Sequence, residues 1–114
     1  MKTVKEKLGV KPSKEVCVIN APNSYREVQS TTSIDRADIV QVFVSSKKEV
    51  QDFVEQNFSK LKKMVALWVT YPKGSSHLGI NRDLLAQYLA DYGLEAVAIC
   101  AVDDKWSALR FKIR

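Results

Sequence analysis

The fold of this chain is decided by residues 37–72, which read ADIVQVFVSSKKEVQDFVEQNFSKLKKMVALWVTYP. The stretch begins and ends with apolar, β-branched runs at 37–45 and 64–72, which are typical of strands buried inside a sheet. The residues between them have the three- and four-residue apolar spacing of an amphipathic helix, which Ser46 and Glu49 begin with a capping-box pattern. A strand, a helix and a strand in this order predict a parallel pair with a right-handed crossover.

The same alternation extends in both directions from this unit. Asn81 is a suitable N-cap for a second long helix, and Gly93 is placed to end it. The other predicted elements are a short helix at 2–8, a strand at 15–20, an ambiguous stretch at 25–33, and a hairpin of strands at 95–102 and 107–113. We therefore expect residues 1–114 to form a single α/β domain with a mostly parallel sheet and a C-terminal antiparallel hairpin.

Composition indicates an ordinary globular protein, with 46% hydrophobic and 27% charged residues. No apolar segment follows the basic N-terminal residues, and no run approaches the roughly 20 apolar residues of a membrane span. We therefore expect a cytoplasmic protein without a secretory signal or a membrane anchor.

Cysteine and histidine are too few for a metal site. Cys17 and Cys100 each lie in a run of apolar residues, which favours buried structural thiols over a redox pair. His77 is the single histidine and has no second histidine or cysteine near it in sequence. We expect neither a metal nor a cofactor.

The net charge of +5 and the pI near 9.3 raise the question of nucleic-acid binding. Two clusters carry part of this charge, and neither has aromatic residues arranged with it as in a base-stacking platform, so a solvated basic face explains them better. The clusters are Lys60, Lys62 and Lys63, and Arg110, Lys112 and Arg114.

Two polar stretches, 71–83 and 103–111, each begin where a predicted strand ends. The carboxyl ends of parallel strands meet at one edge of such a sheet, so we expect the two stretches to be neighbours there. The first would form an electropositive, donor-rich loop at a helix N-terminus, suited to phosphate or carboxylate. The alternative is a loop whose charges are simply solvated. The candidate ligand-binding residues are Lys73, Ser75, Ser76, His77, Asn81 and Arg82.

The second stretch supplies Asp103, Asp104 and Trp106 as a structural clamp or as a wall of the site. Aspartate also forms turns by itself, and the tryptophan would equally serve as a cap on the core. We expect Trp106 to pack against residues 73–80 and Arg82 to reach Asp103 or Asp104. No residue is assigned a catalytic role, because a histidine and serines that are neighbours along a loop are poor evidence for a dyad.

The alternation of side chains along the two central strands assigns them to two faces of the sheet. Val40, Val42, Val44, Val65, Leu67 and Val69 should lie under the two long helices, and Ile39, Gln41, Phe43, Ala66, Trp68 and Thr70 on the opposite face. The N-terminal segment and residues 21–35 are the segments available to cover that opposite face. If they do not suffice, the face would be a homodimer or partner interface.

Several motifs resemble those of a small bacterial family without an assigned activity, namely Tyr-Pro-Lys-x-Ser-Ser from Tyr71 and Asp-x-x-Trp-Ser-x-Leu-Arg-Phe from Asp103. The order of elements also resembles the class I methyltransferase fold, whose last strand inserts between the preceding parallel strand and its hairpin partner. That resemblance implies a reduced Rossmann-like, methyltransferase-like fold. The cofactor site does not carry over, because residues 20–23 contain no glycine where such enzymes have a glycine-rich loop.

The sequence therefore leaves three classes of function open. The first is a non-catalytic module that binds an anionic metabolite at the carboxyl edge of the sheet. The second is an enzyme acting on a phosphorylated or acidic substrate at the same edge, though not an active methyltransferase. The third is a homo-oligomeric interaction module.

Overall fold

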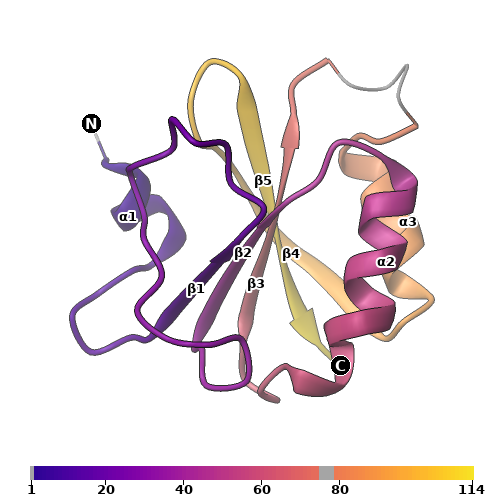
Figure 1. Ribbon diagram of the computed structural model, residues 1–114. Helices are drawn as coiled ribbons and strands as arrows, with labels where there is room; N and C mark the ends of the chain where they lie inside the picture. Colours follow the sequence, from indigo (N-terminus) through magenta and orange to yellow (C-terminus); the bar gives the residue numbers. More distant parts are fainter. Residues whose placement is uncertain (1, 75–78) are drawn as a thin grey trace.

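The computed structural model describes residues 2–74 and 79–114, in which five strands form one open mixed sheet (Figure 1). In chain order the elements are α1 (Val4–Leu8), β1 (Val16–Ile19), β2 (Ile39–Phe43), α2 (Lys47–Asn57), the 3-10 turn η1 (Phe58–Lys60), β3 (Ala66–Pro72), α3 (Arg82–Ala90), β4 (Leu94–Ala101) and β5 (Trp106–Ile113).

The sheet has the order β1-β2-β3-β5-β4. Strands β1, β2 and β3 are parallel, while β5 runs antiparallel between β3 and β4. The last strand is thus inserted between β3 and its own hairpin partner, as the methyltransferase resemblance implied. The predicted α/β fold class is confirmed, with β3 at the centre of the sheet.

Helices α2 and α3 cover one face of the sheet, here called the α2–α3 face (Figure 1). Ser46 Oγ accepts from the backbone N–H of Glu49 and Asn81 Oδ1 from that of Leu84, so both predicted N-caps are present. The Glu49 carboxylate accepts from the N–H of Ser45, one residue earlier than a capping box requires. The predicted core of this face is confirmed, since six valine and leucine side chains are buried there: Val40, Val42, Val44, Val65, Leu67 and Val69.

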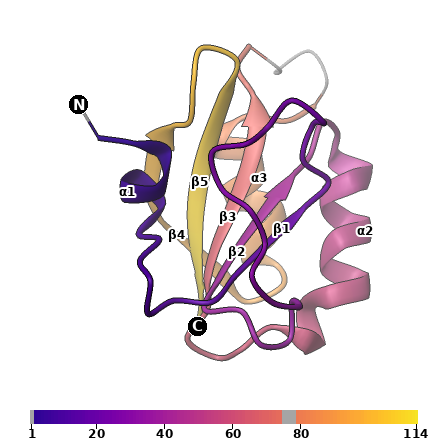
Figure 2. The same cartoon turned by 60° about the vertical axis from the view of Figure 1, so that its left-hand side comes forward.

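The other face, here called the α1 face, is covered by α1 and by the irregular segment 20–38 (Figure 2). Trp68 in β3 is 4% exposed, and its indole Nε1 donates to the carbonyl oxygen of Leu8 at 3.1 Å. Tyr25 and Val28 from the irregular segment are buried in the same cluster. The two covering segments therefore suffice over β2 and β3, and a dimer through this part of the sheet has no exposed apolar surface to use.

The ambiguous stretch at 25–33 is neither a helical turn nor a strand. It closes the free edge of β1 mainly with side-chain hydroxyls, while the backbone N–H groups of Thr31 and Thr32 both donate to the one carbonyl oxygen of Val16. Thr31 Oγ1 accepts from the N–H of Val16 at 2.9 Å, and Ser30 Oγ accepts from the N–H of Val18 at 2.8 Å. Hydroxyl groups that satisfy backbone donors in this way compete with strand pairing, which explains why the periodicity is ambiguous here.

Cys17 is buried and Cys100 is half-buried, and burial raises the pKa of both thiols. A raised pKa keeps a thiol protonated and unreactive, which supports the structural role expected for them. Within residues 2–74 and 79–114, no helix is both long and apolar enough to cross a membrane.

Candidate functional site

The two polar stretches meet at the carboxyl edge of the sheet, as predicted. Pro72 at the end of β3 is paired with Trp106 at the start of β5. One residue further on, the backbone N–H of Lys73 donates to the carbonyl oxygen of Lys105 at 2.8 Å. The β4–β5 turn therefore lies beside the segment that leads from β3 towards α3.

A shallow hollow of about 390 Å³ lies on the α2–α3 face of this edge, at the amino end of α3. It brings together three of the predicted ligand-binding residues: Lys73, Asn81 and Arg82. Tyr71 and Ser107 supply two hydroxyl groups to the same hollow, which is here called the α3 hollow. Ser75, Ser76 and His77 lie outside the described residues.

Lys73, Arg82 and the backbone at the amino end of α3 give the α3 hollow positive charge, while one carboxylate, that of Asp83, also lines it. The amino end of α3 contributes the positive end of the helix dipole. Arg82 Nε lies 3.4 Å from the carboxylate of Asp83, but both side chains are mostly exposed, at 63% and 79%. An exposed pair of this kind is worth less than about 1 kcal/mol, so Arg82 is available to a stronger anionic partner.

Tyr71 gives the floor of the hollow a neutral hydroxyl. Its side chain is buried, and this desolvation raises the pKa of the phenol, opposed in part by the nearby Arg82. The hydroxyl therefore stays protonated at neutral pH. It can donate to an anion or accept from a ligand hydroxyl without adding a competing negative charge.

The second group of predicted residues lines a different cavity, of about 530 Å³, on the α1 face. Asp103, Asp104 and Trp106 surround it together with Tyr25 and Glu27. Asp103 Oδ1 accepts from the N–H groups of Lys105 at 2.7 Å and Trp106 at 2.9 Å, which fixes the hairpin turn. The turn-forming role of Asp103 is the one that the geometry supports.

The expected contact between Arg82 and Asp103 or Asp104 is wrong. Arg82 pairs with its neighbour Asp83, and Asp103 serves its own turn. The expected packing of Trp106 on the loop is also not observed for the described residues, because the ring stacks edge-on against Phe43, with centroids 5.0 Å apart. The physical reason is strand alternation, which directs Ser107 to the α2–α3 face and Trp106 to the opposite one.

A buried polar chain below the second cavity was missed from the sequence. Tyr25 Oη donates to Gln41 Oε1 at 2.9 Å, and Gln41 Nε2 donates to Thr70 Oγ1 at 3.2 Å. Gln41 and Thr70 are 0% exposed, and burial raises the pKa of Tyr25 to about 12. The signal was present in the sequence, since a glutamine inside an otherwise apolar strand needs a buried partner.

The described residues contain no group of three or more histidine, cysteine or acidic side chains arranged to hold a metal ion. The α3 hollow and the second cavity both present hydrogen-bonding groups and charged side chains to a ligand.

No protein-family model matches the chain, and no curated protein matches it. Solved structures do match. A protein of the NADB-Rossmann superfamily from Streptococcus agalactiae superposes with a TM-score of 0.63 at 11% identity, covering 99% of this chain and 68% of that one. A ribosomal protein L11 methylase from Lactobacillus delbrueckii subsp. bulgaricus gives 0.59 at 12% identity, with 97% and 75% covered. A tRNA methyltransferase of B. subtilis gives 0.52 at 13% identity, with 96% and 42% covered.

At these identities the comparisons show the fold alone, and they confirm its Rossmann-like, methyltransferase-like character. The residues after β1 differ from the glycine-rich loop that such methyltransferases have at this position. Asn20 takes a left-handed conformation with φ of 60° where a glycine would be expected, and Tyr25 then folds back against Phe43, with ring centroids 4.8 Å apart. In addition, the side chains of Ser30 and Thr31 close the edge of β1. Among the described residues, no further strand that ends in an acidic residue pairs with β1 there.

Proposed function

We propose that this protein is a non-catalytic module that binds a small anionic metabolite in the α3 hollow. The observation that carries the proposal is the convergence of Lys73, Arg82 and the amino end of α3 on one hollow at the carboxyl edge. Helix N-termini combined with cationic side chains are a common way to hold phosphate and carboxylate groups. Ligands of open α/β sheets bind at this edge.

The polar groups of the hollow match an anion with a hydroxylated body. Lys73 and Arg82 would neutralise the charged group, while Tyr71 and Ser107 offer neutral hydroxyls for the remainder of the ligand. Asp103 favours binding over catalysis, because its Oδ1 is already occupied by two backbone N–H groups of its own turn. An enzyme acting on a phosphorylated substrate remains the alternative, and loss of turnover in Asp103→Asn with the fold intact would identify it.

The test is a thermal-shift screen of phosphorylated and carboxylated metabolites, followed by calorimetry on Lys73→Ala and Arg82→Ala. Each variant should weaken binding about 10- to 100-fold, the scale of one charge-assisted hydrogen bond of about 1.5–3 kcal/mol. The melting temperature of the free protein should hardly change, because exposed charges contribute little to stability. Lys63→Ala, an exposed lysine outside the hollow, is the control and should bind like the parent.

Two results would contradict the proposal. One is the absence of a thermal shift from every anion of the screen. The other is a clear loss of stability in Arg82→Ala without ligand, which would make Arg82 a structural residue.

We propose self-association as a second candidate function, through the outer edge of β4. This strand ends the described sheet, and it carries the exposed apolar side chains of Val97 and Ile99, at 45% and 48%. An unpaired apolar edge is a ready template for pairing with another strand. If it is used, light scattering should report a dimer in the parent and a monomer in Val97→Lys. A monomer in both proteins would remove this candidate.

A further inference from the structure

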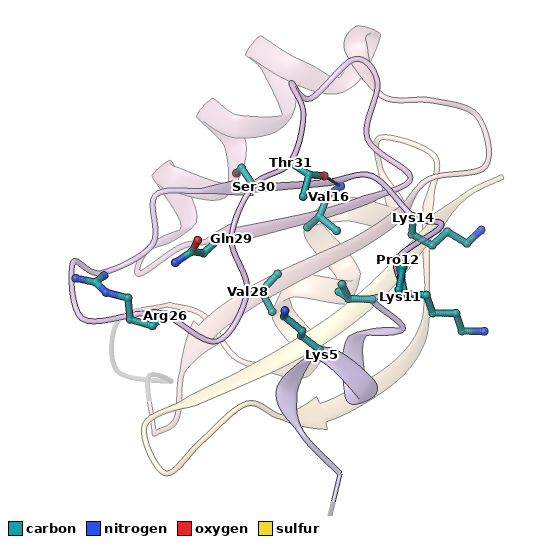
Figure 3. A pocket seen from close by; sticks show the side chains of 11 residues that line it. Lys5, Lys11, Pro12, Lys14, Val16, Arg26, Val28, Gln29, Ser30 and Thr31 are labelled. Carbon is teal, nitrogen blue, oxygen red and sulfur yellow. Dashed lines mark hydrogen bonds between the residues drawn. The ribbon is translucent and has the colours of Figure 1, made fainter.

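A third cavity, of about 720 Å³, lies away from the carboxyl edge and shares no lining residue with the two cavities there. It is bounded on one side by α1 and the loop that follows it, and on the other by the segment that closes the edge of β1 (Figure 3). We call it the basic groove, defined by Lys5, Lys11, Lys14 and Arg26 around a floor that includes Val16 and Val28.

The positive charge of the basic groove is only partly balanced. Lys14 acts electrostatically on the nearby carboxylate of Asp38, and Arg26 Nη1 donates to the carbonyl oxygens of Asn23 and Tyr25. Four cationic side chains line it, and no aspartate or glutamate does. Among the ion pairs of residues 2–74 and 79–114, none involves these four side chains. The carboxylates of Glu15 and Asp38 belong to the same part of the sheet but do not line the groove. Glu15 accepts from the Thr31 hydroxyl, and Asp38 accepts from the N–H of Glu15 and from Lys62 Nζ. Cations that lie near one another repel, so an anionic ligand would lower the electrostatic free energy of the groove.

The cations are spread along the groove instead of converging on one point. Figure 3 shows Arg26 at one end, Lys11 and Lys14 at the other with their amines directed outward, and Lys5 between the two ends. A single carboxylate or phosphate would reach only one of these positions. A ligand with several anionic groups in a row would reach them together, since lysine stems are long and flexible enough to follow it.

The floor indicates which part of such a ligand is recognised. Val16 and Val28 are aliphatic and almost fully buried, and Val10 and Pro12 add further apolar surface. The other uncharged groove residues, Gln29, Ser30 and Thr31, are polar. No aromatic ring lines the groove, so it offers no surface on which a base would stack. Recognition would therefore depend on the anionic groups themselves.

We propose that the basic groove binds a chain of phosphate groups. Two sources share that chemistry, a free polyphosphate and the backbone of a single-stranded nucleic acid. The proposal does not depend on the α3 hollow, because the two sites share no lining residue.

The experiment titrates the parent protein with tripolyphosphate and, separately, with a single-stranded deoxythymidine oligonucleotide at several salt concentrations. The double variant Lys11→Ala/Lys14→Ala should weaken binding at least tenfold, and the salt dependence of oligonucleotide binding should become shallower by about 0.7 for each phosphate that is no longer neutralised. Lys60→Ala/Lys63→Ala removes the same charge from outside the groove and is the matched control.

Binding of tripolyphosphate alone would identify a free polyphosphate as the source, and binding of the oligonucleotide alone would identify nucleic acid. Either result supports the proposal if binding is weakened in Lys11→Ala/Lys14→Ala and unchanged in Lys60→Ala/Lys63→Ala. Equal weakening in the two double variants would show a general charge effect and would overturn the proposal. Failure of the parent to bind either probe at low salt would overturn it as well. The melting temperature of each variant is measured as well, and a value close to that of the parent shows that the variant is folded.

Discussion

Trp68→Ala is expected to lower the free energy of unfolding by about 3–5 kcal/mol, the usual scale for truncating a buried aromatic side chain. Trp68 lies on the central strand β3 and is 4% exposed, so its removal leaves a cavity that neighbouring strands cannot easily fill. It also removes the indole N–H that donates to Leu8 and ties α1 to the sheet. Denaturant unfolding followed by circular dichroism measures the loss.

Trp68→Phe separates packing from the hydrogen bond. Phenylalanine keeps much of the apolar contact and loses the donor to the Leu8 carbonyl, so we expect a cost of about 1–2 kcal/mol. Hydrogen exchange at residues 4–10 should accelerate in both variants, because α1 has only five residues and depends on tertiary contacts. A cost below about 1 kcal/mol for Trp68→Ala would show that the α1 face is loosely packed.

The elements with strong periodicity could be predicted from the sequence. The unit β2–α2–β3 appears within a few residues of its predicted bounds, because buried strands and an amphipathic helix leave clear apolar patterns. The N-cap at Asn81 and the left-handed Gly93, with φ of 83°, follow from local chemistry that neighbouring elements do not alter. Local signals of this kind are sufficient where tertiary contacts agree with them.

The irregular segment 20–38 could not be predicted, because its structure depends on groups that are distant in sequence. Ser30 and Thr31 take their positions from the backbone of β1, and Tyr25 takes its position from Gln41 in β2. For the same reason, the basic groove was not visible in the sequence. Its cations belong to two separate segments that come together only when both cover the α1 face.

Closure of the β1 edge also explains why the described sheet ends at this strand. In a larger sheet an additional strand would pair with β1, whereas here hydroxyl groups of Ser30 and Thr31 satisfy two of its donors. An edge blocked by side chains is a poor template for another chain. The opposite edge, β4, is covered less. Lys7 Nζ donates to the carbonyl oxygen of Ala101 at 2.8 Å, and the pairing with β5 is irregular between Ala96 and Ala98, but Val97 and Ile99 remain exposed. This difference is why we place any self-association there.

Gln41→Leu is expected to destabilise the protein by about 2–5 kcal/mol, even though leucine is apolar and of similar size. Gln41 is 0% exposed and bridges the hydroxyls of Tyr25 and Thr70. Leucine leaves both hydroxyls without their partner, and each buried polar group that loses its partner costs about 1–3 kcal/mol. Equilibrium denaturation of the single variant measures the total.

The triple variant Tyr25→Phe/Gln41→Leu/Thr70→Val tests the cause. It removes every polar group of the chain while keeping the shapes close to the original, and replacing all partners together can be nearly neutral. We therefore expect the triple variant to be more stable than Gln41→Leu alone, although it carries three changes in the core. Strictly additive losses would show instead that the three side chains act through packing, because residues in one hydrogen-bonded network are expected to couple. Recovery of stability in the triple variant would establish that the cost of Gln41→Leu comes from the hydroxyls of Tyr25 and Thr70 that lose their partner.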